Sequence, residues 1–144
     1  MTSHSAATAK LSVDVKFAVM RLTRRLRAER SGDEISHAQF TVLAIISSRG
    51  PQGIGQLSEL ERVTPPSMNR TVNCLEDAGL VERDSSPDDG RIVLVKMTET
   101  GSTLVRETQE RRGAWLSARL DELTPAQRST LEDAAAILKK IATQ

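Results

Sequence analysis

The side chains best suited to chemistry share the polar face of one short predicted helix: Ser67, Asn69, Arg70 and Asn73. Hydroxyl, amide and guanidinium groups of this size can donate to and accept from base edges in the major groove of DNA. The apolar residues between them recur at i, i+4 and i+7, which is the spacing of a buried stripe. The polar face is therefore predicted to lie on the protein surface, where it would contact duplex DNA.

The elements around this helix are predicted from caps, breakers and alternation. Thr64 is placed to cap the helix, Pro65 occupies its first position, and Gly79 ends it. A strand follows at once, residues 85–90 have turn composition, and residues 92–98 alternate between the two faces of a second strand. A helix followed by a two-stranded ribbon is typical of a winged helix-turn-helix, with the helix in the major groove and the ribbon on the adjoining backbone.

The remaining segments are predicted to be helical, so the expected fold is mainly α, with about six helices and a small β-hairpin wing. Apolar residues recur at helical spacing over residues 10–30, and Ser31–Glu34 breaks the pattern. Two capping boxes mark later helix starts, one beginning at Ser36 and one at Thr124. The apolar stripes of the first and last helices cannot bury themselves alone and need a partner surface.

This pattern predicts one domain with four parts. They are a disordered tail (1–9), an N-terminal dimerisation helix (10–34), a winged helix-turn-helix that binds DNA (35–98) and C-terminal dimerisation helices (99–144).

Composition excludes several classes of function. With one Trp, two Phe and no Tyr among 144 residues, the chain lacks the side chains for an aromatic-walled enzyme pocket or an RNA-stacking platform. A single Cys excludes an intramolecular disulfide framework and fits a reducing cytosol. No apolar run reaches the roughly 18 residues that a membrane span needs, and the polar start, Met1–Thr8, is expected to be a frayed tail without an apolar signal region. We therefore expect a cytoplasmic protein.

Charge is unevenly distributed, although the formal net charge is only +1. Residues 1–30 carry seven basic and two acidic side chains, whereas the predicted reading unit, residues 55–98, carries five basic and eight acidic ones. Bulk charge therefore does not indicate DNA binding, and that prediction depends on pattern. The basic run over residues 21–30 is interpreted first as a solvated helix face, with a phosphate contact or an anion-binding cavity as alternatives.

The motifs of the central region carry a resemblance to a known family. They are Pro66-Ser67 with Arg70, Leu75-Glu76, Gly79–Arg83, Pro87–Arg91 and Met97–Gly101. In this order they resemble the multiple-antibiotic-resistance regulator (MarR) family of winged helix-turn-helix transcriptional regulators, from about residue 10 to the end. The Asp-x-Arg wing followed by the Thr-x-x-Gly turn is moderately specific for the family. Together with the Gly-Leu-Val-x-Arg segment and the overall length, the match is strong.

The resemblance implies a homodimer whose first and last helices, with part of the long fifth, intertwine with those of the partner. It implies that the polar helix residues face bases or adjoining phosphates, and that Thr64 and Pro66 set the helix entrance near the backbone. Arg91 would enter or straddle the minor groove, and Asp89 would brace the wing. The two DNA-binding units of the dimer, one per protomer and here called reading heads, would match a pseudo-palindromic operator with half-sites roughly 10 bp apart. The dimerisation residues would be Leu11, Val15, Leu22, Leu120, Leu131, Leu138 and Ile141.

Three places depart from the family pattern. Asn73 and Cys74 stand where many relatives carry an acidic residue and then Arg. Gly90 precedes Arg91 where many relatives carry Arg-Arg, and Ala78 stands where a basic residue is common. These changes remove positive charge from the reading surface, so we expect a shallower salt dependence than in close relatives. Cys74 is interpreted as a small filler rather than a redox sensor.

Many members of the family bind small phenolic or carboxylate effectors, which favour a head spacing that no longer matches the operator. In this chain Arg21, Arg24, Arg25 and His37 are the candidates for holding such an anion. Two His and one Cys at their spacing do not make a metal site, and no cofactor is predicted. The effector, the operator and the target genes stay open. Repression is favoured over activation because a repressor needs only to occupy a promoter.

A protein–protein adaptor and an enzyme are the two alternatives to a DNA-binding regulator. A protein–protein adaptor that kept the fold and lost DNA binding fits the acidic balance of residues 55–98, but would need apolar anchors on the polar helix face. An enzyme is poorly supported, because the sequence has no Gly-rich phosphate loop, nucleophile elbow or metal-spaced cluster.

Overall fold

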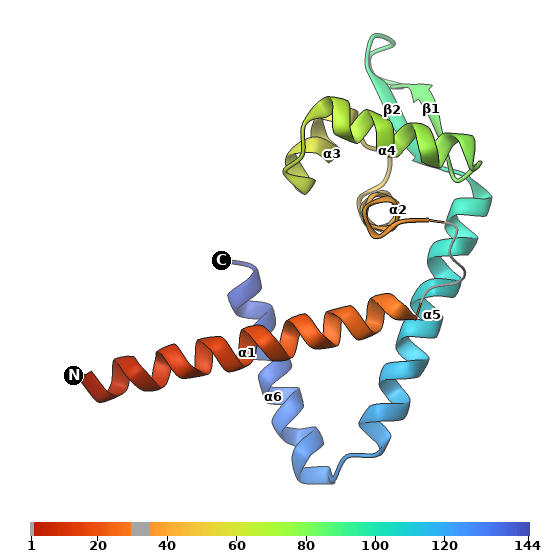
Figure 1. Ribbon diagram of the computed structural model, residues 1–144. Coiled ribbons are helices and arrows are strands. Elements are labelled where there is room, and N and C mark those ends of the chain that lie inside the picture. Colours follow the sequence, from red (N-terminus) through yellow and green to blue (C-terminus); the bar gives the residue numbers. More distant parts are fainter. Residues whose placement is uncertain (1, 30–34) are drawn as a thin grey trace. The chain divides into compact units, whose positions relative to one another are not determined.

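The computed structural model describes residues 2–29 and 35–144, which contain six helices and one antiparallel hairpin (Figure 1). The predicted fold class, mainly α with a β-hairpin wing, is confirmed. In chain order the elements are α1 (Thr2–Ala28), α2 (His37–Arg49), α3 (Ile54–Glu61), α4 (Pro65–Asp77), β1 (Val81–Ser85), β2 (Val93–Met97), α5 (Glu99–Asp121) and α6 (Pro125–Ala142). The helix break predicted at Ser31–Glu34 lies outside the described residues.

Helix α1 reaches further towards the N-terminus than the sequence pattern predicts. Residues 1–9 were expected to form a disordered tail, but the helix begins at Thr2 and continues for 27 residues. Ala6, Ala7 and Ala9 favour this extension because alanine has the highest helix propensity, and neither glycine nor proline interrupts the stretch. The tail prediction is therefore corrected for residues 2–9, which are helical.

Two of the helices begin at the capping boxes that the sequence predicts. At α2, the Gln39 backbone N–H donates to the Ser36 hydroxyl at 3.2 Å, and the Ser36 N–H donates to the Gln39 side chain at 2.9 Å. At α6, Thr124 and Gln127 make the same exchange at 3.2 and 3.0 Å. Each box satisfies two backbone N–H groups that would otherwise lack an intrahelical partner.

The hairpin is joined to the segment that precedes α3. β1 and β2 pair in antiparallel register, with Val81 opposite Met97 and Arg83 opposite Val95. Gln52 adds an isolated bridge: its N–H donates to the Val95 carbonyl at 3.0 Å, and its carbonyl accepts from the Val95 N–H at 2.7 Å. β2 therefore has a partner along each of its edges, with β1 on one side and Gln52 on the other.

The chain divides into two compact units. One unit, Arg27–Glu110, contains α2, α3, α4 and the hairpin, and α4 packs against α2, α3 and β1 (Figure 1). The other contains the chain up to Leu26 and Arg111–Gln144. Every buried hydrophobic residue of the core belongs to the first unit: Phe40, Val42, Leu43, Ile46, Leu57, Met68, Val72, Leu75, Leu80, Val81, Val95 and Val105.

Candidate nucleic-acid interface

Helix α4 begins at the cap that the sequence predicts. The Thr64 hydroxyl accepts a hydrogen bond from the Ser67 backbone N–H at 3.3 Å. Pro65 and Pro66 occupy the first two helical positions, where a missing N–H costs no intrahelical bond. The Thr71 hydroxyl donates to the Ser67 carbonyl at 3.3 Å. These bonds hold the entrance of α4 in one conformation.

The two faces of α4 separate as predicted. The apolar stripe retains at most 2% of its exposure: Met68, Val72 and Leu75. On the other face Asn69, Arg70 and Asn73 are exposed, and Ser67 is half-buried. Burying each apolar side chain contributes about 1.5–3 kcal/mol, so core packing fixes which face of α4 points to solvent.

A cluster that the sequence analysis did not predict joins α4 to β1. Arg83 donates from Nη1 to Glu76 Oε1 at 3.0 Å, and from Nη2 to Asn73 Oδ1 at 2.9 Å and to Asn69 Oδ1 at 3.4 Å. We call these four residues the Arg83 cluster. The sequence contains one indication of this cluster. Asn69, Asn73 and Glu76 recur at i, i+4 and i+7, so they line one side of the helix.

The tip of the wing is organised around Asp89. Its carboxylate accepts hydrogen bonds from the Arg91 backbone N–H at 3.0 Å and from Arg91 Nε at 3.3 Å. The Asp89 carbonyl also accepts from the Ile92 N–H at 3.0 Å. The Arg91 side chain is 93% exposed, and an ion pair this exposed contributes little stability. Asp89 therefore shapes the turn, while the Arg91 guanidinium stays accessible to an external anion.

Lys96 on β2 lies between two carboxylates of β1. Its Nζ is 2.9 Å from Asp84 Oδ2 and 3.4 Å from Glu82 Oε1. The hydrogen bond from Lys96, then the backbone N–H of Ser85, lower the pKa of the Asp84 carboxyl. The hydrogen bond and charge of Asp84, followed by those of Glu82, raise the pKa of Lys96.

We expect this pair to make the wing less ordered in acid. Because the pKa of Asp84 is lower in the folded protein than in the unfolded chain, its stabilising contribution is present above about pH 4 and is lost as the pH falls through the folded pKa. Amide hydrogen exchange of β1 and β2 in the wild type should therefore accelerate, relative to Asp84→Asn, as the pH drops below about 4. An identical pH dependence in the two proteins would contradict this expectation.

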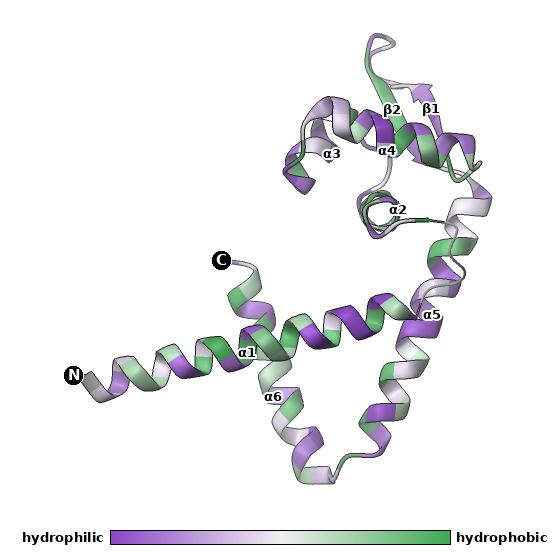
Figure 2. Ribbon diagram, in the orientation of Figure 1, coloured by the Kyte–Doolittle hydropathy of each residue, from purple (hydrophilic) through white to green (hydrophobic). Residues whose placement is uncertain are grey.

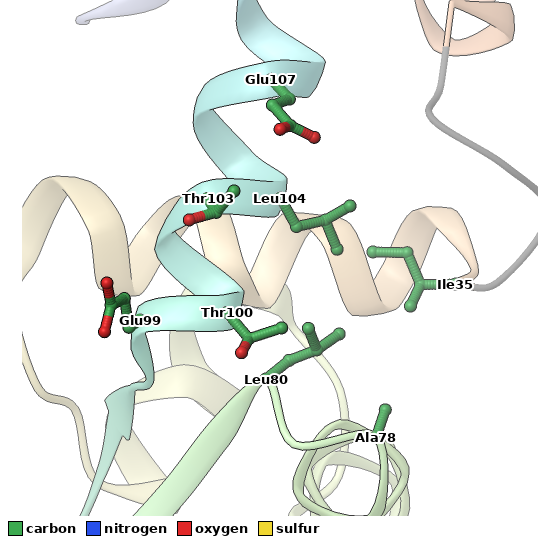
Figure 3. Close-up of a pocket in the computed structure, with 8 residues that line it drawn as sticks. All are labelled: Ile35, Ala78, Leu80, Glu99, Thr100, Thr103, Leu104 and Glu107. Atoms are coloured by element: carbon green, nitrogen blue, oxygen red, sulfur yellow. The ribbon is translucent and has the colours of Figure 1, made fainter.

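A pocket of about 490 Å³ lies beside the start of α5 in the same unit (Figure 3). It is lined by Ile35, Ala78, Leu80, Glu99, Thr100, Thr103, Leu104 and Glu107. Two of these side chains are carboxylates, and none of the described lining residues is basic. The pocket therefore offers no complementary charge to an anionic effector.

The four residues predicted to hold an effector do not line this pocket. Arg21, Arg24 and Arg25 lie on α1, whereas His37 is the first residue of α2 and belongs to the other unit. The Arg25 guanidinium carbon lies 4.8 Å from the centroid of the Trp115 ring, within the range of a cation–π contact. The role of these four residues in effector binding stays a prediction.

The unit formed by α1, α6 and the end of α5 exposes much of its apolar surface. Figure 2 shows hydrophobic residues spread along α1 and α6. Five of the seven predicted dimerisation residues are between 38% and 62% exposed: Leu11, Leu22, Leu131, Leu138 and Ile141. The other two, Val15 and Leu120, are half-buried. Leu22, Leu120, Leu131 and Leu138 also line a groove of about 420 Å³.

Other kinds of site find no support in the described part of the chain. Residues 2–29 and 35–144 contain no group of three His, Cys, Asp or Glu side chains that could hold a metal ion. None of the helices described is long and apolar enough to cross a membrane. Cys74, which the sequence analysis interprets as a small filler, is exposed.

Comparison with known proteins agrees with this geometry. The model of the MarR family matches residues 35–93. The HTH-type transcriptional regulator Mb0904 of Mycobacterium bovis is 39% identical over 130 residues, covering 90% of this chain and 91% of that protein. A MarR family protein from Bacillus stearothermophilus superposes with a TM-score of 0.85 at 21% identity, covering 97% of this chain and 98% of that one.

A third similar protein is Bordetella bronchiseptica BpsR, whose DNA binding is regulated by 6-hydroxynicotinic acid. Its structure matches with a TM-score of 0.66 at 20% identity, covering 92% of this chain and 93% of that one. The motif order, the exposed face of α4 next to a wing, and the family and homologue matches lead to one conclusion. The chain belongs to the MarR family of winged helix-turn-helix transcriptional regulators.

Proposed function

We propose that this regulator recognises specific sequences in double-stranded DNA through α4 and the wing, and that it acts as a repressor. The observation that carries the proposal is the exposed polar face of α4 next to an exposed arginine at the wing tip. The proposed DNA-contacting set is Thr64, Pro66, Ser67, Asn69, Arg70, Asn73, Asp89 and Arg91. Its relatives are bacterial transcriptional regulators, so the proposed place of action is the cytoplasm, with the chromosome.

The proposed functional form is a homodimer. Apolar side chains on α1 and α6 stay exposed in the single chain, including Phe17 and Ile137, each 59% exposed. Exposed apolar side chains in this number suit a protein–protein interface, and a second copy would offer the same surface in a two-fold arrangement. Two reading heads would then bind half-sites about one helical turn, roughly 10 bp, apart in a pseudo-palindromic operator.

Release of the repressor by a small phenolic or carboxylate effector is part of the proposal. Its support is the likeness to BpsR, whose DNA binding is regulated by 6-hydroxynicotinic acid, a hydroxylated aromatic carboxylate. The acidic lining of the pocket beside α5 disfavours an anion there, so the proposed contacts are Arg21, Arg24, Arg25 and His37. Such an effector would act by favouring the dimer conformation whose head spacing does not match the operator.

Two substitutions test the proposed contacts. Arg91→Ala should weaken binding to all duplexes similarly and reduce the salt slope by about 1, because a phosphate contact carries no sequence information. Asn73→Ala should instead lose about 1–3 kcal/mol of discrimination at one or two base pairs. Both are measured by fluorescence anisotropy against the chain's own promoter region and a scrambled duplex, at two salt concentrations. Two variants that bind every duplex like the wild type would refute these roles.

A protein–protein adaptor is the second candidate, favoured by the excess of acidic over basic side chains in residues 55–98. The exposed face of α4 argues against it, because adaptors use apolar or aromatic anchors and this face carries amides and a guanidinium. Salt-dependent retention on duplex DNA separates the two candidates, since only a DNA reader releases counterions when it binds.

A further inference from the structure

The Arg83 cluster lies on the proposed reading face and uses groups that DNA would otherwise meet. Arg83 is opposite Val95 in the hairpin, and Val95 is fully buried. Its guanidinium is further tied to α4 by the ion pair with Glu76, and the Arg83 side chain is only 25% exposed. Arg83 is therefore anchored at its backbone and at its guanidinium, with limited freedom to rearrange.

The chemistry of the guanidinium fixes the orientation of two amides. A guanidinium carries five N–H donors and no acceptor, so any amide atom it contacts must be the oxygen. Arg83 Nη2 lies 2.9 Å from Asn73 Oδ1 and 3.4 Å from Asn69 Oδ1. Both carboxamides are thus held with their oxygens towards Arg83, and their Nδ2 amino groups remain as donors for another partner.

We propose that Arg83 is a specificity-determining positioning residue, which locks Asn69 and Asn73 as hydrogen-bond donors and so makes the reading face prefer guanine and thymine over adenine and cytosine. In the major groove, guanine O6 and thymine O4 are acceptors at the position where adenine N6 and cytosine N4 are amino donors, while N7 is an acceptor in both purines. The preference therefore applies where an asparagine Nδ2 group meets the base at the O6/O4 position. An asparagine usually reads adenine with its oxygen and nitrogen together, and here the oxygen is engaged by Arg83. The inference rests on the proposed DNA-binding function.

The test selects binding sites from randomised duplexes with five versions of the full-length protein. Asn69→Ala and Asn73→Ala identify the base pairs that each asparagine reads. At each of those pairs, one strand should accept both guanine and thymine in the wild-type sites and disfavour both adenine and cytosine. Arg83→Met should reduce this preference over adenine and cytosine about five- to tenfold, and leave the preference at other pairs unchanged. Arg106→Met removes the same charge from an exposed position on α5 and should keep the wild-type profile.

Glu76→Gln provides an independent test of the same contact if Arg83→Met does not fold. Glu76→Gln keeps a hydrogen-bond acceptor on a side chain that is 41% exposed, but removes the charge that anchors Arg83. It should shift the base preference in the same direction as Arg83→Met, by a smaller factor. A merely structural role for Arg83 would lower thermal stability without changing which base is selected.

The outcomes separate this inference from the proposed function. Two results would overturn the inference alone: an unchanged profile in Arg83→Met and Glu76→Gln, or wild-type sites that accept adenine or cytosine on that strand as readily as guanine and thymine. Alanine variants that weaken binding to every sequence equally would also overturn it, because they would place the amides on phosphates. A wild-type protein without any sequence preference would refute sequence-specific DNA binding itself, and this inference with it.

Discussion

Aspartate at both Ile137 and Ile141 is expected to split the proposed dimer and to raise the operator Kd by a factor of about 10²–10⁴. The two side chains are one helical turn apart on α6 and are 59% and 61% exposed in the single chain. In a dimer they would be buried, and burying an unpaired carboxylate costs several kcal/mol. The separated heads would lose the gain in effective concentration that comes from linking two half-site contacts.

Sedimentation velocity and anisotropy on the same samples measure the two effects together. Ser129→Asp adds one negative charge at an exposed, polar position of the same helix, and should leave both the oligomeric state and the operator affinity close to wild type. A double variant that sediments as a dimer, or a wild type that sediments as a monomer while binding a full operator tightly, would exclude dimerisation through this face of α6.

Replacement of Gly101 by alanine is expected to destabilise the unit that contains the wing by about 3 kcal/mol. Gly101 is buried in the first turn of α5, and an added Cβ would overlap the carbonyl oxygen of Leu80 and come within 2.9 Å of the Met97 side chain. The Leu80 carbonyl cannot give way easily, because it accepts a hydrogen bond from the Thr98 N–H at 3.1 Å. Urea unfolding followed by circular dichroism measures the loss.

Gly113 provides the control on the same helix. No atom lies within 4 Å of the position that a Cβ would take there. Gly113→Ala should therefore stabilise the protein by about 0.4–1 kcal/mol, since alanine reduces the freedom of the unfolded chain and favours the helix. If both substitutions changed the free energy of unfolding equally, the close approach of Leu80 and Met97 would not be the reason that position 101 requires glycine.

The sequence alone was sufficient where the determining interactions are local. The caps at Ser36, Thr64 and Thr124 each involve residues three positions apart, so residue type and spacing predict them directly. The two faces of α4 follow from helical periodicity, and Gly79, with a φ of 73°, ends the helix where the sequence predicts. The extension of α1 to Thr2 was missed because alanine-rich polar segments have neither an apolar stripe nor a cap to mark them.

Tertiary structure alone decided the contacts between residues that are distant in sequence. The bonds of Arg83 to Glu76, Asn73 and Asn69 span 7, 10 and 14 positions. The close approach of Gly101 to Leu80 and the bridge from Gln52 to Val95 likewise join separate elements. Periodicity states which face of an element is buried, but not which neighbour meets it or at what register. Only the packing of α4, the hairpin and α5 against a shared core sets those partners, and with them the amide groups that stay free on the proposed reading face.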